Sequence, residues 1–237
     1  MKKTIISALL GLSLLPLCTN AAIDSSDKKE IEKIVREYLL ENPQLIVEVM
    51  QNLERKEMEK AESNIPTVVK KVLASDDLPS IGKKGAKHYI IEFFDYNCGY
   101  CKVMEPYFKK AIEEFDLRIV YVNIPVIKRE SEQLAVFGQA IYNIDKKKYF
   151  AYHDYFMKPG NKGASTDVLK AVCEEIGINF DDVLAELKTM KAQETVRDSM
   201  ETSQLLNIRG TPYLIIDGKE YRGAITSYEI LSKILNQ

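Results

Sequence analysis

The chain has 237 residues and a formal net charge of −2, with 33 lysines and arginines against 35 aspartates and glutamates. This balance gives no reason to expect binding to nucleic acid or to an anionic membrane surface. Beyond the N-terminal segment, no apolar stretch approaches the length of a membrane-spanning helix. The length is enough for one sizeable core with an appendage.

The first 21 residues have the pattern of a secretory signal peptide. A start with two lysines precedes an apolar run from Ile5 to Leu17 and then small and polar residues. We expect cleavage after Ala21 and export to an oxidising periplasm, where disulfides persist. The alternative is lipidation of Cys18 with outer-membrane association, although the residue before it is bulky where that signal normally has a small one.

Residues 22–74 predict an N-terminal arm of amphipathic helices. The Asn42-Pro43 pair is expected to start the second helix, with the asparagine as its cap, and a third short helix is predicted after Asn64-Ile65-Pro66. Two or three such helices build little core alone, so their stripes must pack on the main domain or on another subunit, and we favour a homodimer. The two stripes are Ile31, Ile34, Val35, Tyr38 and Leu39, and Leu45, Ile46, Val49, Met50 and Leu53.

A linker and one α/β domain follow the arm. Residues 75–87 are polar and rich in turn formers, which predicts a linker. Residues 88–237 predict a strand, a helix, a strand, a helical stretch at about 128–207, a hairpin turning at Asp217-Gly218, and a last helix. The pattern therefore indicates an α/β domain that contains a helical insertion.

The Cys98-Gly99-Tyr100-Cys101 motif lies between the strand predicted at 89–94 and the start of the following helix. Unpaired backbone N–H groups and the positive end of the helix dipole stabilise a thiolate there, and a thiolate is the species that attacks disulfides. Cys101 is close enough to resolve a mixed disulfide on Cys98. Cys173 is expected to be a small buried residue, and the remaining possible ligands are too isolated for a metal site.

The chain resembles the DsbA-like thiol-disulfide oxidoreductases of the thioredoxin superfamily, which carry a helical domain inserted in the thioredoxin fold. Three features carry the resemblance: the stretch Glu92–Lys102 around the cysteines, the stretch Arg209–Leu214, which looks like the family's cis-proline loop, and the insert between them. The N-terminal segment, including Tyr38–Pro43, resembles the helical oligomerisation arms ahead of some DsbA-like and ScsC-like periplasmic proteins. We therefore expect a thioredoxin fold with a helical insertion, preceded by a helical arm.

The resemblance assigns chemistry to three residues. Cys98 is the nucleophile and Cys101 the resolving thiol, so that the only redox group expected is the Cys98–Cys101 disulfide, without a cofactor or metal. Thioredoxin-like proteins commonly place an acid where Glu92 stands, beneath the site, and burial would let it take the proton from Cys101. From the strand pattern alone, Glu92 could also face solvent.

The resemblance also implies a substrate-binding surface. Thr211 would present its backbone to an extended substrate, with Pro212 in the cis conformation, close to Gly99 and Tyr100. A plain trans turn is the alternative at Pro212. His153 lies on a strongly aromatic helix and is expected to pack in the core or in a groove, without a catalytic role.

These features predict a periplasmic thiol-disulfide oxidoreductase that forms or isomerises disulfides in secreted proteins. Gly99-Tyr100 supplies no cation, which favours a weaker oxidant, and DsbC isomerases share this pair. Thr211 and the arm also favour an isomerase, whereas the insert favours an oxidase. The expected partners are unfolded or misfolded secreted proteins and a DsbB-like oxidase or DsbD-like reductase in the membrane. A non-enzymatic chaperone or binding protein is the alternative function.

Overall fold

The computed structural model describes residues 24–160 and 163–237. The predicted signal peptide and Cys18 lie outside the described residues. Within the described part, none of the helices combines the length and the apolar character that crossing a membrane requires. The chain divides into two compact units, one ending at Leu53 and the other running from Glu54 to Gln237.

The first unit consists of helix α1 (Ser25–Glu41) and the beginning of helix α2 (Gln44–Ala74). No residue of α1 is buried. The predicted break between the helices is present, but Asn42 is the C-cap of α1 and not the cap of α2: its side-chain amide donates to the Tyr38 carbonyl at 2.8 Å. The last carbonyls of a helix lack partners within the helix, and this amide supplies one.

Helix α2 continues without a break through Pro66, so the predicted third helix is wrong. A proline inside a helix removes one backbone hydrogen bond and costs about 3 kcal/mol. The helix continues because apolar residues on both sides of Pro66 bury the same face, and each such side chain contributes roughly 1.5–3 kcal/mol. We call these residues the inner face of α2; they are Ala61, Ile65, Val68 and Val72.

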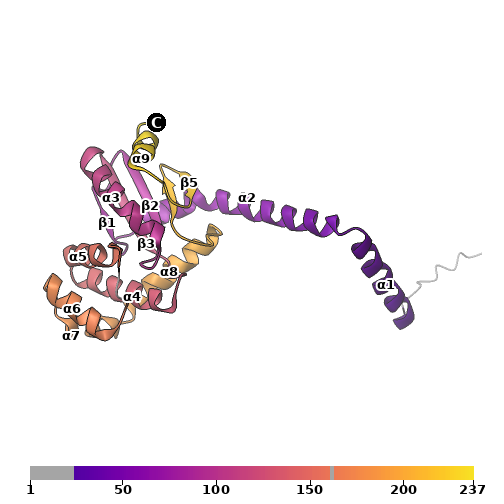
Figure 1. Ribbon diagram of the computed structural model, residues 1–237, viewed down its shortest axis with the longest axis horizontal. Helices are drawn as coiled ribbons and strands as arrows, with labels where there is room; N and C mark the ends of the chain where they lie inside the picture. Colours follow the sequence, from indigo (N-terminus) through magenta and orange to yellow (C-terminus); the bar gives the residue numbers. More distant parts are fainter. Residues whose placement is uncertain (1–23, 161–162) are drawn as a thin grey trace, which may run out of the picture. The chain divides into compact units, whose positions relative to one another are not determined.

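The second unit is built on a five-stranded mixed sheet with the order β1-β3-β2-β4-β5. Strands β1, β2, β3 and β5 are labelled in Figure 1. The central strand β2 runs parallel to β3 and antiparallel to β4. The strands are β1 (Ser80–Ile81), β2 (His88–Phe94), β3 (Leu117–Asn123), β4 (Tyr213–Ile216) and β5 (Lys219–Arg222). Strand β1 lies inside the segment predicted as a linker, because its two residues pair antiparallel with β3.

Strand β2 is buried on both faces. Successive side chains of a strand point to opposite faces, so Ile90 and Phe94 join one apolar cluster and Ile91 and Phe93 join the other. Helices α3 (Gly99–Glu114) and α9 (Tyr228–Leu235) contribute to the first cluster, and the inner face of α2 contributes to the second. The second cluster therefore ties the latter part of α2 to the sheet, although residues 22–74 were expected to form a separate arm.

The helical insertion follows β3 and returns to β4. Its helices are α4 (Arg129–Ile144), α5 (Lys146–Met157), α6 (Thr166–Ile176), α7 (Phe180–Leu187) and α8 (Lys191–Leu205). Aromatic residues of α5, including Tyr149 and Tyr152, join the same cluster as α3. The architecture is the predicted thioredoxin fold with a helical insertion, preceded by N-terminal helices.

Candidate active site

Cys98 is the N-cap of α3, directly after the turn that follows β2. Its Sγ accepts a hydrogen bond from the backbone N–H of Cys101 at 3.3 Å, and the thiol donates to the Thr211 carbonyl at 3.3 Å. Hydrogen bonding from the Cys101 thiol, together with that from the backbone N–H groups of Cys101 and Tyr100, outweighs burial and lowers the pKa of Cys98 from 9.0 to about 6. Cys98 is therefore largely a thiolate at neutral pH.

Cys101 lies one turn into α3 and is completely buried. Burial, the hydrogen bond that its thiol gives to Cys98, and the charge of Glu92 all raise its pKa far above the ordinary value. Both cysteines are free thiols in this structure. The site thus favours a thiolate at Cys98, as a nucleophile requires, and a protonated thiol at Cys101, as a resolving cysteine requires before exchange.

Glu92 lies in the middle of β2 and has no exposed surface, so the expected burial is confirmed. Neither of its carboxylate oxygens has a hydrogen-bond partner among the described residues. Burial, followed by the charges of Glu105 and Cys98, raises the pKa of Glu92 well above its ordinary value. This environment favours the protonated form of the carboxyl group.

The second loop of the site contains the Thr211-Pro212 peptide bond, which is cis as predicted. The loop borders a groove of about 320 Å³ lined by residues 208–213 together with Arg222 and Gly223. On the other loop, Gly99 and Tyr100 are exposed, and Tyr100 keeps 68% of its surface accessible. The structure therefore brings Cys98 next to Thr211 and leaves Gly99 and Tyr100, which follow Cys98, exposed.

Asp95 organises the site although the sequence did not single it out. It is fully buried, and its carboxylate accepts hydrogen bonds from the backbone N–H groups of Val126 and Ile127, each at 2.9 Å, and of Asn97 at 2.8 Å. These bonds join the turn before Cys98 to the connection that leads from β3 into the insertion. The sequence signal that could have identified Asp95 is an acidic residue directly after an apolar strand.

Glu105 is a second residue that the sequence analysis missed. It is buried on α3, four residues after Cys101, and its Oε2 lies 3.4 Å from Nε2 of His153. Spacing by four residues places side chains on one helix face, so an acid on the cysteine face of α3 was detectable. His153 is buried as expected, and Glu105 gives it a polar partner that the sequence did not reveal.

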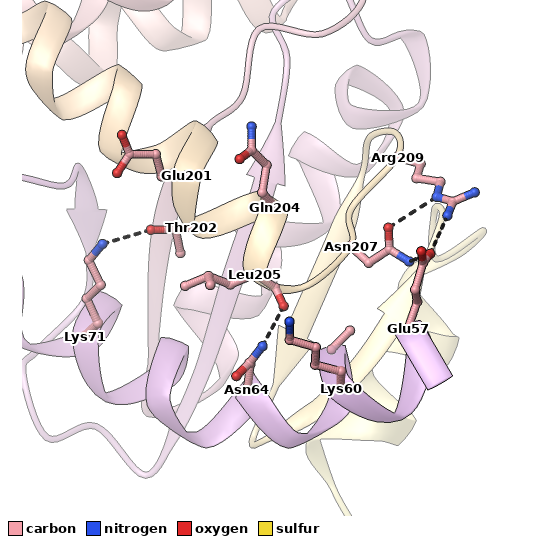
Figure 2. A pocket seen from close by; sticks show the side chains of 11 residues that line it. Glu57, Lys60, Asn64, Lys71, Glu201, Thr202, Gln204, Leu205, Asn207 and Arg209 are labelled. Atoms are coloured by element: carbon pink, nitrogen blue, oxygen red, sulfur yellow. Dashed lines mark hydrogen bonds and ion pairs between the residues drawn. The ribbon is translucent and has the colours of Figure 1, made fainter. Parts of the chain in front are cut away.

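A polar cluster connects α2 with the segment that precedes the cis-proline loop (Figure 2). Arg209 donates to Glu57 at 3.0 Å and to the Asn207 side chain at 3.2 Å, and Asn64 donates to the Leu205 carbonyl at 2.9 Å. These residues line a groove of about 640 Å³. The described residues contain no group of three side chains suited to hold a metal ion.

Comparison with known proteins identifies the family. The family described as DSBA-like thioredoxin domain matches residues 89–235, and the family described as Copper resistance protein ScsC N-terminal domain matches residues 27–60. The chain therefore belongs to the DSBA-like thioredoxin domain family, as the motifs predicted. This membership, with the paired cysteines at the start of α3, supports a thiol-disulfide oxidoreductase.

Individual relatives agree with this assignment. The chain is 24% identical over 154 residues to the probable disulfide bond formation protein D of Bacillus anthracis, covering 59% of this chain and 69% of that protein. The disulfide bond formation protein D of Bacillus subtilis is 23% identical over 151 residues, covering 60% and 68%.

Solved structures show the same fold. The thiol-disulfide exchange protein alpha-DsbA2 from Wolbachia pipientis is 25% identical with a TM-score of 0.68, covering 74% of this chain and 94% of that one. Proteus mirabilis ScsC in a transitional conformation is 24% identical with a TM-score of 0.63, and the match covers 92% of this chain and 97% of that one.

Proposed function

We propose that this protein is a periplasmic thiol-disulfide oxidoreductase that both forms and isomerises disulfides in secreted proteins. The observation that carries the proposal is the different environment of two cysteines three residues apart. Cys98 caps the start of α3 and accepts a hydrogen bond from the backbone N–H of Cys101, which lowers its pKa to about 6, whereas Cys101 is completely buried and its pKa is strongly raised. The Cys98–Cys101 disulfide is the only redox group that the proposal requires.

Disulfide formation starts from the oxidised Cys98–Cys101 pair. A substrate thiolate attacks Sγ of Cys98, the bond between the two cysteines breaks, and Cys101 leaves with the electron pair and takes the proton held by Glu92. A second substrate thiolate then attacks the substrate sulfur of the mixed disulfide and releases Cys98 as a thiolate. The substrate loses two electrons and the protein gains them, and a DsbB-like membrane partner would remove them.

Isomerisation starts from the reduced pair. The Cys98 thiolate attacks a non-native substrate disulfide, and the substrate thiolate that is released attacks another disulfide of the substrate. The thiolate set free there attacks the substrate sulfur of the mixed disulfide, which releases Cys98 as a thiolate without net oxidation. When this rearrangement stalls, Glu92 that has lost its proton to solvent accepts the Cys101 proton, and the Cys101 thiolate attacks Cys98 and frees the substrate in reduced form. A DsbD-like reductase would keep the pair reduced for this activity.

Two assays separate the activities. One measures oxidation of a reduced peptide, and the other measures reactivation of a scrambled multi-disulfide protein in a redox buffer. We expect activity in both, and a protein that oxidises the peptide but never rescues the scrambled substrate would refute the isomerase part. Full biological activity of Cys98→Ala would instead support the non-enzymatic chaperone alternative.

We also propose that the arm assembles the protein into a homodimer. The arm between residues 24 and 53 exposes a set of apolar side chains larger than a soluble monomer normally leaves uncovered. Closed twofold pairing is the commonest way for identical chains to bury such faces. The exposed residues are Ile31, Ile34, Val35, Tyr38, Leu39, Leu40, Ile46, Val47, Val49, Met50 and Leu53.

Light scattering on protein lacking residues 1–21 tests the assembly. We expect about twice the monomer mass, and the monomer mass after further deletion of residues 22–53. The deletion stops at Leu53 because a cut after residue 74 would also remove the inner face of α2 from the core. The shortened protein should oxidise the peptide but lose isomerase activity. A larger assembly would replace the dimer, and a full-length monomer would refute assembly through the arm.

Export through residues 1–21 is the proposed route to the periplasm. Cell fractionation with mass determination of the purified protein tests this route, and the expected product begins at Ala22. A protein that begins at a lipid-modified Cys18 and is found in the outer-membrane fraction would instead support the lipoprotein alternative.

A further inference from the structure

The active-site end of the second unit contains three buried carboxyl groups, and while Asp95 is satisfied by backbone N–H groups, Glu92 and Glu105 have other surroundings. Glu92 on β2 has no hydrogen-bond partner among the described residues, whereas Glu105 on α3 faces His153 of α5. The side chain of Glu105 is 8% exposed and that of His153 is 1% exposed, so water screens this pair little. The imidazole therefore interacts with Glu105 across the packing surface between the thioredoxin fold and the insertion.

The orientation of the His153 ring is fixed on all sides. Its Nδ1 lies 3.4 Å from the Tyr96 hydroxyl and 3.5 Å from the Tyr149 hydroxyl, which directs Nε2 at Glu105. To donate to the carboxylate, Nε2 must carry a hydrogen, and in the neutral ring Nδ1 then accepts from a tyrosine. The rings of Phe94, Tyr96, Tyr121 and Tyr149 pack around the imidazole.

The ionisable groups around the two carboxyls favour ionisation of Glu105. Burial opposes it, but the charge and hydrogen bond of His153, together with the charge of Lys109 on the same helix, lower the pKa of Glu105 overall. The charge of Glu105 in turn helps to raise the pKa of Glu92. The other ionisable groups that interact with these carboxyls are Cys98, Cys101, Tyr96, Tyr121 and Tyr149.

We propose that His153 is a positioning residue for disulfide exchange: it holds Glu105 ionised, so that Glu92 rests protonated and can give its proton to Cys101. Glu92 lies opposite Tyr121 in the pairing of β2 with β3, and the Tyr121 ring lies 4.6 Å from the ring of His153, so Glu92 and the Glu105–His153 pair share one buried region. Two carboxyls in one dry region do not both ionise readily, and the one with a basic partner keeps the charge. When the Cys98–Cys101 disulfide is opened, the Cys101 thiolate takes the Glu92 proton and Glu92 becomes the carboxylate. The inference rests on the proton-transfer role of Glu92 in the proposed function.

Carbon-13 NMR of the glutamate side-chain carboxyls tests the proposal directly. The signals of the full protein with the Cys98–Cys101 disulfide closed are assigned by comparison with Glu92→Gln and Glu105→Gln. At neutral pH we expect a carboxylate signal for Glu105 and a carboxylic acid signal for Glu92. An ionised Glu92 at neutral pH overturns the proposal.

Variants then test whether His153 determines which of Glu92 and Glu105 is ionised. His153→Phe keeps a ring in the aromatic surroundings but removes the N–H donor, so Glu105 should become protonated and Glu92 should titrate about one pH unit lower or more. Glu105→Gln should lower the titration of Glu92 in the same way with the imidazole still present. His153→Phe should add nothing to Glu105→Gln, because both act through one charge. If His153→Phe does not fold, Glu105→Gln carries the test.

The neighbouring Asp154 supplies a matched control. Asp154 on α5 forms an exposed ion pair with Lys109 on α3 at 2.7 Å, so Asp154→Asn breaks a contact between the same two helices and leaves in place the Lys109 charge that favours ionised Glu105. We therefore expect the titration of Glu92 not to fall in Asp154→Asn. An unmoved Glu92 titration in His153→Phe and Glu105→Gln would refute the proposal.

Failure of the proposed role of Glu92 is measured separately. If Glu92→Gln opens the oxidised pair as fast as the native protein, Glu92 transfers no proton in that step. The charge assignment from NMR would still stand in that case, so the two failures can be distinguished.

Discussion

The two parts of α2 carry the same kind of apolar residues with opposite results. On the inner face, Val68 and Val72 are each 1% exposed, because the sheet covers them. Before Leu53, Val49 is 56% exposed although its helical spacing is equally regular. The comparison teaches that periodicity identifies the face of a helix that needs cover but does not identify what covers it. We call the second unit, Glu54–Gln237, the body. Under our proposals, the body performs disulfide exchange and the arm of residues 24–53 forms the dimer.

The largest expected effect tests whether chemistry belongs to the body alone. Cys98→Ala removes the only nucleophile with a lowered pKa among the described cysteines. The rate of peptide oxidation should fall by roughly 10³-fold or more. Light scattering should give the same mass as for the native protein, and a dissociated variant would break the separation between body and arm.

The next effect compares the two parts of α2 in stability. Val68→Asp places a charge in the buried cluster and should lower the free energy of unfolding by about 3–5 kcal/mol. Val49→Asp should leave it nearly unchanged at low protein concentration, because Val49 is already exposed in the single chain. Denaturant unfolding of both variants at low protein concentration measures the difference. Equal losses would mean that the arm is part of the folded body.

The pH dependence of Cys98 sharpens the description of the body. With a pKa of about 6, its alkylation rate in the reduced protein should rise about tenfold between pH 5 and pH 7 and then level off. The folded pKa lies below the ordinary value of 9.0, so the thiolate stabilises the reduced protein fully above pH 9 and this stability is lost as pH falls through 6.

Mass spectrometry should find Cys98 labelled before Cys101 and Cys173, and preferential labelling of Cys173 would contradict the assignment.

The smallest effect concerns the contact between α2 and the segment before the cis-proline loop. Glu57→Gln weakens an ion pair with Arg209 whose side chains are both more than half exposed, so the free energy of unfolding should fall by less than about 1 kcal/mol. Glu59→Gln is the matched control, because it breaks an exposed pair with Arg55 within α2 alone. A larger loss for Glu57→Gln would show that this contact holds the loop in place.

Local pattern was sufficient for the reactive part of the site. The position of Cys98 before a helix depends on a strand pattern followed by a helical pattern, and both are local in sequence. The burial of Glu92 followed from apolar neighbours on both sides in the strand. The cis bond at Pro212 came from the resemblance of its loop to a known family.

Long-range packing decided what the sequence could not. Continuation of α2 through Pro66 depends on cover from the sheet, which no local propensity contains. The pairing of Glu105 with His153 joins residues 48 positions apart. A buried acid is recognisable from its helix face, but its charge depends on the group that folding brings against it.

The sequence by itself determined the family, the paired cysteines and the order of helices and strands, because these depend on short-range spacing and on motifs. Only the tertiary structure decided where the arm ends, which residues accept hydrogen bonds at the site, and which buried carboxyl has a basic partner. The physical reason is that burial and electrostatic interaction depend on distance in space, and elements far apart in the chain meet only in the folded protein.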